Sequence, residues 1–308
     1  MSSQSAFETE LCIAGPIREP KQMLAEQEYG GHLSIHDDAT AEKLGFAAGP
    51  IEGPTHFSQF VPLLTEIWGV EFLERGCLSA HYQNVCVEGD RVRAFAARPE
   101  GDARCVRIWA EKADGTPVLT GTATMGPEHP SSELDERMGR LRPPGDLLIL
   151  ADLEVGMKGP EAEDAKMDFD QNMGALYPFS LNQKLQKITE PSPFYTAKEA
   201  TSSPWKRPII PWEMVSVLAQ YSHRAGFPVK GPAVGLFADQ EIKMIAGPLF
   251  VGHPYRLERE IVAISESRRT ESYWERTQIH DGETGALVAQ MLLNHATLKE
   301  SYAGYQKA

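Results

Sequence analysis

Apolar residues recur at helical spacing in two stretches of the chain, one in each half. In residues 55–69 (THFSQFVPLLTEIWG) the apolar positions that share one helix face are Phe57, Phe60, Val61, Leu64 and Ile67. Thr55 is a candidate N-cap, and Gly69 is typical of a helix end. Residues 212–226 (WEMVSVLAQYSHRAG) have a similar apolar stretch. We therefore predict one central helix in each half.

Segments in which apolar and polar residues alternate follow each predicted helix, as expected of half-buried strands. In the first half they are residues 78–90, 91–100, 105–116 and 117–126. In the second half they are residues 235–253, 255–268, 270–284 and 285–298. Asp-Gly and Gly-Asp turns separate several of them. The pattern predicts an antiparallel meander after each helix, and therefore an α+β fold.

The two halves repeat one plan within 308 residues. Pro50 and Pro208 stand before the two helices, 158 residues apart, and the Asp114-Gly115 and Asp281-Gly282 turns are 167 residues apart. These offsets indicate a diverged tandem duplication. The polar stretch 127–146 reads as a connection, and the acidic stretch 154–174 as a solvated loop. We expect two domains, 1–150 and 151–308.

Composition narrows the possible partners. The net charge is −13 and no run is rich in Lys or Arg, so we expect no nucleic-acid partner. No apolar run has the length of a membrane span, and the first residues lack the pattern of a secretory signal, so we expect a cytoplasmic protein that does not enter a membrane. The four cysteines show no CxxC spacing and read as free thiols.

Candidate chemistry gathers in residues 32–60, where His and acidic residues run through a Gly/Pro-rich turn into the first helix. His36 is the first candidate for acid/base catalysis, because a free His titrates near neutral pH. Glu52 is its candidate partner, since burial raises a carboxyl pKa, and His56 is the third candidate. The turn through Gly53 can also deliver free backbone N–H groups to the same point as these side chains.

Each candidate also has a structural reading. His36 and His56 fit a packed turn or helix, and Glu52 fits a carboxylate beside a helix N-terminus. Asp38 is a candidate substrate contact, or with Asp37 a cap for a short helix. The spacing of the His and acidic residues matches no familiar metal motif, and GxGxxG and GxxxxGK[ST] loops do not occur. We expect neither a metal nor a cofactor.

One helix followed by an antiparallel meander, repeated twice, is the order of a double hotdog protein. The first half also resembles the MaoC-like, (R)-specific enoyl-CoA hydratase family. The matching positions are Ile35-His36, Asp38, Ala41, Gly45-Phe46 and the turn Ile51-Glu52-Gly53. The chain departs from the family motif in having Gly31 at the catalytic Asp, Leu33 at the Asn, and Glu52 at the turn His.

The second half resembles the degenerate hotdog units of the same superfamily. Residues 191–195 (PSPFY) stand where the motif has Asn-Pro-x-His, with Tyr195 near the His position, and Pro211-Trp212 replaces the His-Gly turn. Tyr195 and Trp212 are candidates for an apolar substrate pocket, with core packing as the alternative. Arg207 is a candidate contact for an anion, or for an acidic neighbour.

The resemblance implies a lyase that adds or removes water beside the carbonyl of an acyl thioester or a similarly activated substrate. His36 would exchange the proton, Glu52 would assist, and the Gly53 N–H would stabilise the enolate. A hotdog thioesterase that uses Glu52 to activate water is an alternative, and so is a non-catalytic partner subunit. The substrate would be a small molecule such as a CoA thioester. The chain would be a monomer that mimics the usual dimer, or a homo-oligomer.

Overall fold

A single antiparallel sheet of ten strands organises the described residues, which are 11–29, 32–159, 162–220 and 226–305 of this computed structural model. The strand order is β1-β5-β6-β7-β4-β9-β12-β11-β10-β8. The first five strands are β1 (Cys12–Ala14), β5 (Val92–Ala97), β6 (Cys105–Lys112), β7 (Pro117–Met125) and β4 (Gly76–Tyr82). The others are β9 (Gly235–Met244), β12 (Leu287–Leu298), β11 (Thr270–Asp281), β10 (Tyr255–Glu266) and β8 (Ala162–Ala165). A small hairpin pairs β2 (Glu28–Tyr29) with β3 (His32–Leu33).

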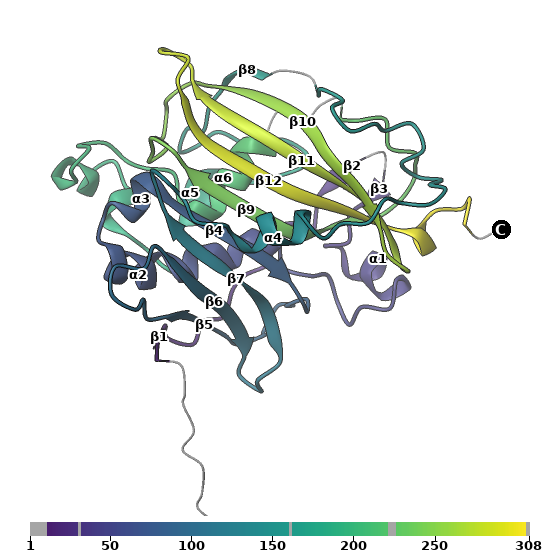
Figure 1. Cartoon of the computed structure of the whole chain (residues 1–308), viewed down its shortest axis with the longest axis horizontal. Coiled ribbons are helices and arrows are strands. Elements are labelled where there is room, and N and C mark those ends of the chain that lie inside the picture. Colours follow the sequence, from purple (N-terminus) through teal and green to yellow (C-terminus); the bar gives the residue numbers. More distant parts are fainter. Residues whose placement is uncertain (1–10, 30–31, 160–161, 221–225, 306–308) are drawn as a thin grey trace, which may run out of the picture.

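The two halves meet where β4 pairs with β9, with Ala80 opposite Gln240. The helices are α1 (Asp38–Lys43), α2 (Phe57–Trp68), α3 (Phe72–Arg75), α4 (Glu133–Met138), α5 (Leu181–Leu185) and α6 (Trp212–Gln220). Short 3₁₀ turns are η1 (Gly53–His56), η2 (Pro193–Tyr195), η3 (Glu199–Ser202) and η4 (Lys299–Ser301). Figure 1 shows α2 and α6 on one face of the sheet and α4 on the other.

The main core lies between the sheet and the two central helices. Apolar residues of α2 and α6 face strand residues that alternate inward, as the helical and strand periods require. Buried members of this core are Phe57, Phe60, Leu64, Leu78, Met214, Val217, Leu218 and Ile242. The Phe72 ring stacks on Trp212, with centroids 5.0 Å apart. Each half therefore has a helix packed on strands, and the two helices share one core.

The central helices confirm the sequence prediction, but the first begins differently. Gly69 ends α2 with φ of 70°, as expected of a glycine stop. Thr55 is not an N-cap, because the chain already turns as a 3₁₀ helix from Gly53, with Pro54 at its start. The prediction for residues 212–226 is confirmed for Trp212–Gln220, and residues 221–225 lie outside the described part of the chain.

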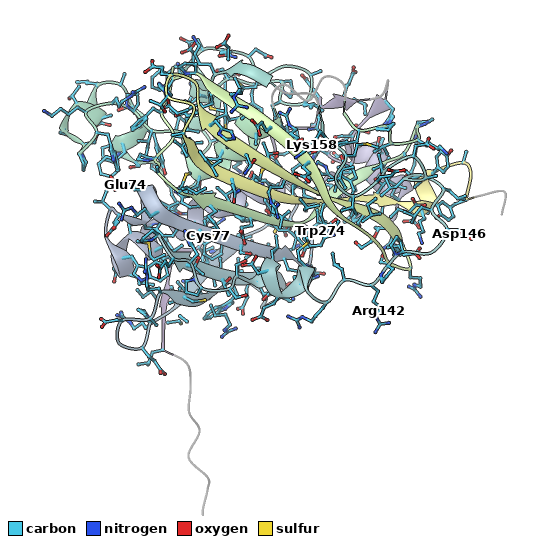
Figure 2. All side chains as sticks on the ribbon, turned by 45° about the horizontal axis from the view of Figure 1, so that its top comes forward. Glu74, Cys77, Arg142, Asp146, Lys158 and Trp274 are labelled. Carbon is cyan, nitrogen blue, oxygen red and sulfur yellow. The ribbon has the colours of Figure 1, made fainter. Side chains whose placement is uncertain are left out.

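The predicted strands are present in the expected order, but β4 ends at Tyr82 and β9 at Met244, short of the expected ends, and both are buried over runs of residues instead of alternately. The two polar stretches hold more structure than expected. Residues 127–146 contain α4, whose Ser132 and Asp135 form a capping box. Farther along this connection, Arg142 and Asp146 are exposed and point away from the sheet (Figure 2). The stretch 154–174 is not a purely solvated loop, because it supplies β8 and the buried Met167 and Met173.

Polar side chains fasten α4 to the outer face of the sheet where the halves join. Asp239 of β9 is 2% exposed and accepts hydrogen bonds from His81 (2.7 Å) and Asn294 (2.7 Å), with Arg137 of α4 2.9 Å away. Ser132 donates to Glu241 at 2.5 Å. These contacts come from both halves, so they tie the connection to the β4–β9 seam.

Candidate active site

One cavity of about 470 Å³ lies at the start of α2. His36, Glu52, Gly53 and His56 all line it, and so does Tyr82 at the end of β4. Second-half residues also line it, among them Tyr177, Phe237, Tyr273 and His295. The fold thus brings the candidates His36, Glu52, Gly53 and His56 to one cavity whose wall belongs to both halves.

Two glycines allow the turn before α2 to fit. A Cβ on Gly49 would lie 2.1 Å from the His36 carbonyl oxygen. The Gly49 N–H donates to Asp38 Oδ1 at 2.8 Å. A Cβ on Gly53 would lie 2.5 Å from Tyr82 Cζ. Only glycine fits either position without displacing its neighbour, so the turn is pressed between the His36 loop and the Tyr82 ring.

His36 has a defined tautomer. Its Nδ1 lies 2.6 Å from the Pro50 carbonyl oxygen. Because a carbonyl oxygen only accepts, Nδ1 carries the proton in the neutral ring and Nε2 remains an acceptor. Burial lowers the pKa of His36 below its ordinary value, and the bond to Pro50 opposes this in part. His36 is therefore a neutral base at pH 7.

Glu52 is a buried carboxyl group that titrates near neutrality. Its side chain is 6% exposed, and Oε1 has no hydrogen-bond partner among the described residues. Burial raises its pKa to about 7, while the charge of Lys184 and a hydrogen-bonding interaction with Tyr177 lower it, and Glu213 raises it. Glu52 makes no cap hydrogen bond. A carboxyl group poised in this way suits proton transfer at pH 7.

His56 is buried in η1 at 2% exposure. The Gln59 amide nitrogen lies 3.4 Å from His56 Nδ1, so Nδ1 accepts and Nε2 carries the proton. Burial, together with the charge of Lys184, lowers the pKa of His56 to about 4. The remaining ring nitrogen, Nε2, is therefore a donor in neutral His56 and an acceptor in neutral His36.

Gly53 begins a continuous helical segment, since η1 leads directly into α2. Among the described residues, none accepts a hydrogen bond from the Gly53 N–H. A free N–H at a helix N-terminus favours an anionic oxygen. The cavity therefore combines an acceptor, a titrating carboxyl group and a donor for negative charge.

Comparisons with known proteins bear on the fold. No protein-family model and no curated protein matches the sequence. A candidate MaoC domain protein dehydratase from Chloroflexus aurantiacus J-10-fl superposes with a TM-score of 0.58 at 15% identity, covering 95% of both chains. A conserved hypothetical protein from Mycobacterium tuberculosis with a double hotdog fold superposes with a TM-score of 0.56 at 12% identity, covering 95% of this chain and 97% of that one. This chain has the double hotdog fold.

In this double hotdog chain, four candidates from the sequence are not among the residues that line the cavity. Asp38 is exposed and holds the Gly49 N–H, while Asp37 caps α1. Arg207 lies over the Phe250 ring at 4.3 Å. Tyr195 and Trp212 are buried in the core at 2% and 1% exposure. The expected substrate contacts of these four residues are therefore not made in this cavity; Gly31 lies outside the described residues.

Sequence reasoning also missed residues that shape the site. Tyr82, whose hydroxyl donates to Gln240 at 2.8 Å, lies in an ordinary strand pattern. Tyr177, Lys184 and Glu213 come from the second half, and nothing in their local sequence points to residues 52–56. Within the described ranges, no group of three or more His, Cys, Asp or Glu side chains is arranged to hold a metal, and no helix is long and apolar enough to cross a membrane.

Proposed function

We propose that the chain is a lyase that removes water from, or adds water to, an acyl thioester or a similarly activated carbonyl compound. The observation that carries the proposal is the sharing of one cavity by Glu52, with a pKa of about 7, and His36, whose Nε2 is an acceptor. The two residues are not hydrogen-bonded to each other among the described contacts. They are therefore free to act on different atoms of one substrate.

In the dehydration direction, His36 Nε2 takes the proton from the carbon next to the carbonyl. The electron pair moves toward the carbonyl oxygen, where the Gly53 N–H stabilises the negative charge. The protonated Glu52 then gives its proton to the leaving hydroxyl group, so that the β C–O bond breaks and water departs. Hydration is the reverse sequence. His56, which lines the same cavity, donates a hydrogen bond from its neutral ring to an oxygen atom of the substrate.

The test is turnover of 3-hydroxyacyl and 2-enoyl thioesters, with CoA as the first carrier and the enoyl absorbance as the signal. Glu52→Gln and His36→Gln are expected to lower kcat roughly 10²- to 10⁴-fold, the usual contribution of a general acid or base. Glu66→Gln is the matched control, because Glu66 is exposed on α2. If both site variants keep kcat within a few-fold of the control on a substrate that the wild type turns over, the assignment is wrong.

A thioesterase is the second candidate, supported by Glu52 Oε1, which has no hydrogen-bond partner in the described part of the chain and in the ionised form can activate a water molecule. Hydrolysis releases a free thiol and an acid, whereas hydration does not release the thiol. Thiol detection on the same substrates separates the two. Release of one thiol per substrate consumed, lost in Glu52→Gln, would establish the hydrolase instead of the lyase.

A further inference from the structure

A second-half segment, residues 175–184, packs against the first-half elements that carry the candidate site. The Gln27 side chain donates to the Leu176 carbonyl at 2.6 Å. Tyr177 interacts with Glu52 and also with Ser216 of α6. Lys184 donates to Thr55 Oγ1 at 3.3 Å. The turn from Glu52 to His56 is therefore held by contacts from the other half.

Lys184 is the buried cation of this segment. Its side chain is 5% exposed and lies 3.2 Å from Glu213 Oε1, which is 1% exposed at the start of α6. The Phe179 ring lies 5.8 Å from its Nζ. The α5 helix that carries Lys184 begins with a capping box between Ser180 and Gln183. Lys184 is thus fixed at both its backbone and its ammonium group.

A buried ion pair adds little net stability, because removing both charges from water costs about as much as their attraction returns. A role in stability alone is therefore a weak account of Lys184 and Glu213. Lys184 of α5 contacts Thr55, just before α2, and Glu213 lies in the first turn of α6. Thr55 is two residues from Gly53 and three from Glu52. The ammonium group contacts the turn that carries the proton-transfer site.

The groups that act electrostatically on Glu52 come from several elements. They are Lys184 of α5, Glu213 of α6 and Tyr177 of the second-half segment, while Tyr82 of β4 in turn feels the charge of Glu52. Among these described groups, only Lys184 is positively charged. Its effect opposes ionisation of His56 and favours ionisation of Glu52.

We propose that Lys184 is a positioning residue for the proposed reaction: its ammonium group, held by Glu213, fixes the Glu52–His56 turn through Thr55 and keeps a buried positive charge at that turn. The inference rests on the proposed function. Lys184 and Glu213 of the second half thus complete the proton-transfer site without lining the cavity themselves.

The test compares the pH dependence of kcat in Lys184→Met, Glu213→Gln and the wild type. The pH at which kcat changes because Glu52 ionises is near 7 in the wild type. This midpoint of the pH-rate limb is expected to rise in Lys184→Met by at least about one pH unit, as for loss of a nearby opposite charge. In Glu213→Gln it is expected to move downward. KM should change less than about twofold, because neither residue lines the cavity. Lys184→Arg, which keeps the charge, should return the limb toward the wild-type position.

Lys187→Met is the matched control, because Lys187 is exposed just beyond α5. A limb that stays in place in both Lys184→Met and Glu213→Gln, or that moves in the same direction in both, would overturn the proposal. If Lys184→Met does not fold, the double variant Lys184→Met with Glu213→Gln removes both buried charges together. It should still move the limb upward, because the effect of Lys184 on Glu52 exceeds that of Glu213.

A second measurement does not depend on turnover. The difference in unfolding free energy between the wild type and Glu52→Gln, followed against pH, reports the ionisation of Glu52. In the Lys184→Met background the midpoint of this difference should rise above that in the wild-type background. An unchanged midpoint would refute the role of Lys184. If the wild type turned over no thioester while Lys184→Met still shifted the midpoint of the stability difference, the proposed function alone would be refuted.

Discussion

Glu52→Gln is expected to change how the free energy of unfolding depends on pH. Glu52 has a pKa of about 7 in the folded protein against an ordinary value of 4.5, because burial disfavours its charge. A folded-state pKa above the unfolded one means that the stability contribution is complete below pH 4.5 and is lost as pH rises through 7. The wild type should therefore weaken relative to Glu52→Gln over this range.

The expected size follows from the gap between the two pKa values. At about 1.36 kcal/mol per pH unit, the gap between 4.5 and about 7 corresponds to roughly 3 kcal/mol. The amide that Glu52→Gln introduces cannot ionise, so the difference between the two proteins isolates this group. A constant offset from an altered interaction with Tyr177 would not vary with pH in this way.

Urea unfolding from pH 4.5 to 8.5, followed by the fluorescence of the five tryptophans, measures the difference directly. Glu66→Gln serves as the exposed control on the neighbouring helix α2 and should track the wild type. A difference between wild type and Glu52→Gln that stays constant within about 0.5 kcal/mol, the scale of ordinary surface substitutions, would refute the reasoning. It would mean that Glu52 titrates as an ordinary exposed carboxyl group.

Three further predictions concern the site and the seam between the halves. For dehydration, kcat should fall above about pH 7 as Glu52 loses its proton. It should also fall at acidic pH, where His36 gains a proton with a pKa below its ordinary value of 6.5. A thioesterase would instead gain activity as Glu52 ionises. Gly53→Ala should lower the unfolding free energy by about 1–3 kcal/mol, since the new Cβ meets the Tyr82 ring, and unchanged urea unfolding would contradict this. Asp239→Asn should cost about 1–3 kcal/mol in urea unfolding, because the buried Asn294 amide and the partly exposed His81 lose a charged acceptor, and a cost under about 0.5 kcal/mol would contradict this.

The sequence by itself determined the local elements of this protein. Periods of 3.6 and 2 residues mark α2 and the strands of both meanders, because the burial of one face imposes the period on each element. The repeated order indicated the double hotdog fold. The Gly/Pro turn 49–54 was recognisable as the entry to the central helix, because Pro fixes φ and Gly adopts backbone conformations closed to other residues.

Only the tertiary structure decided which side chains share the cavity. Asp38 and Arg207 look like binding residues in the sequence, yet one holds a backbone N–H and the other covers a Phe ring. Lys184 gives no local signal, and it reaches Thr55 across 129 positions of the chain. Ionisation of Glu52 depends on burial and on charges brought from the second half, and such long-range contacts leave no period in the sequence. The sequence thus indicated where the candidate site starts, and packing of the two halves sets its electrostatics.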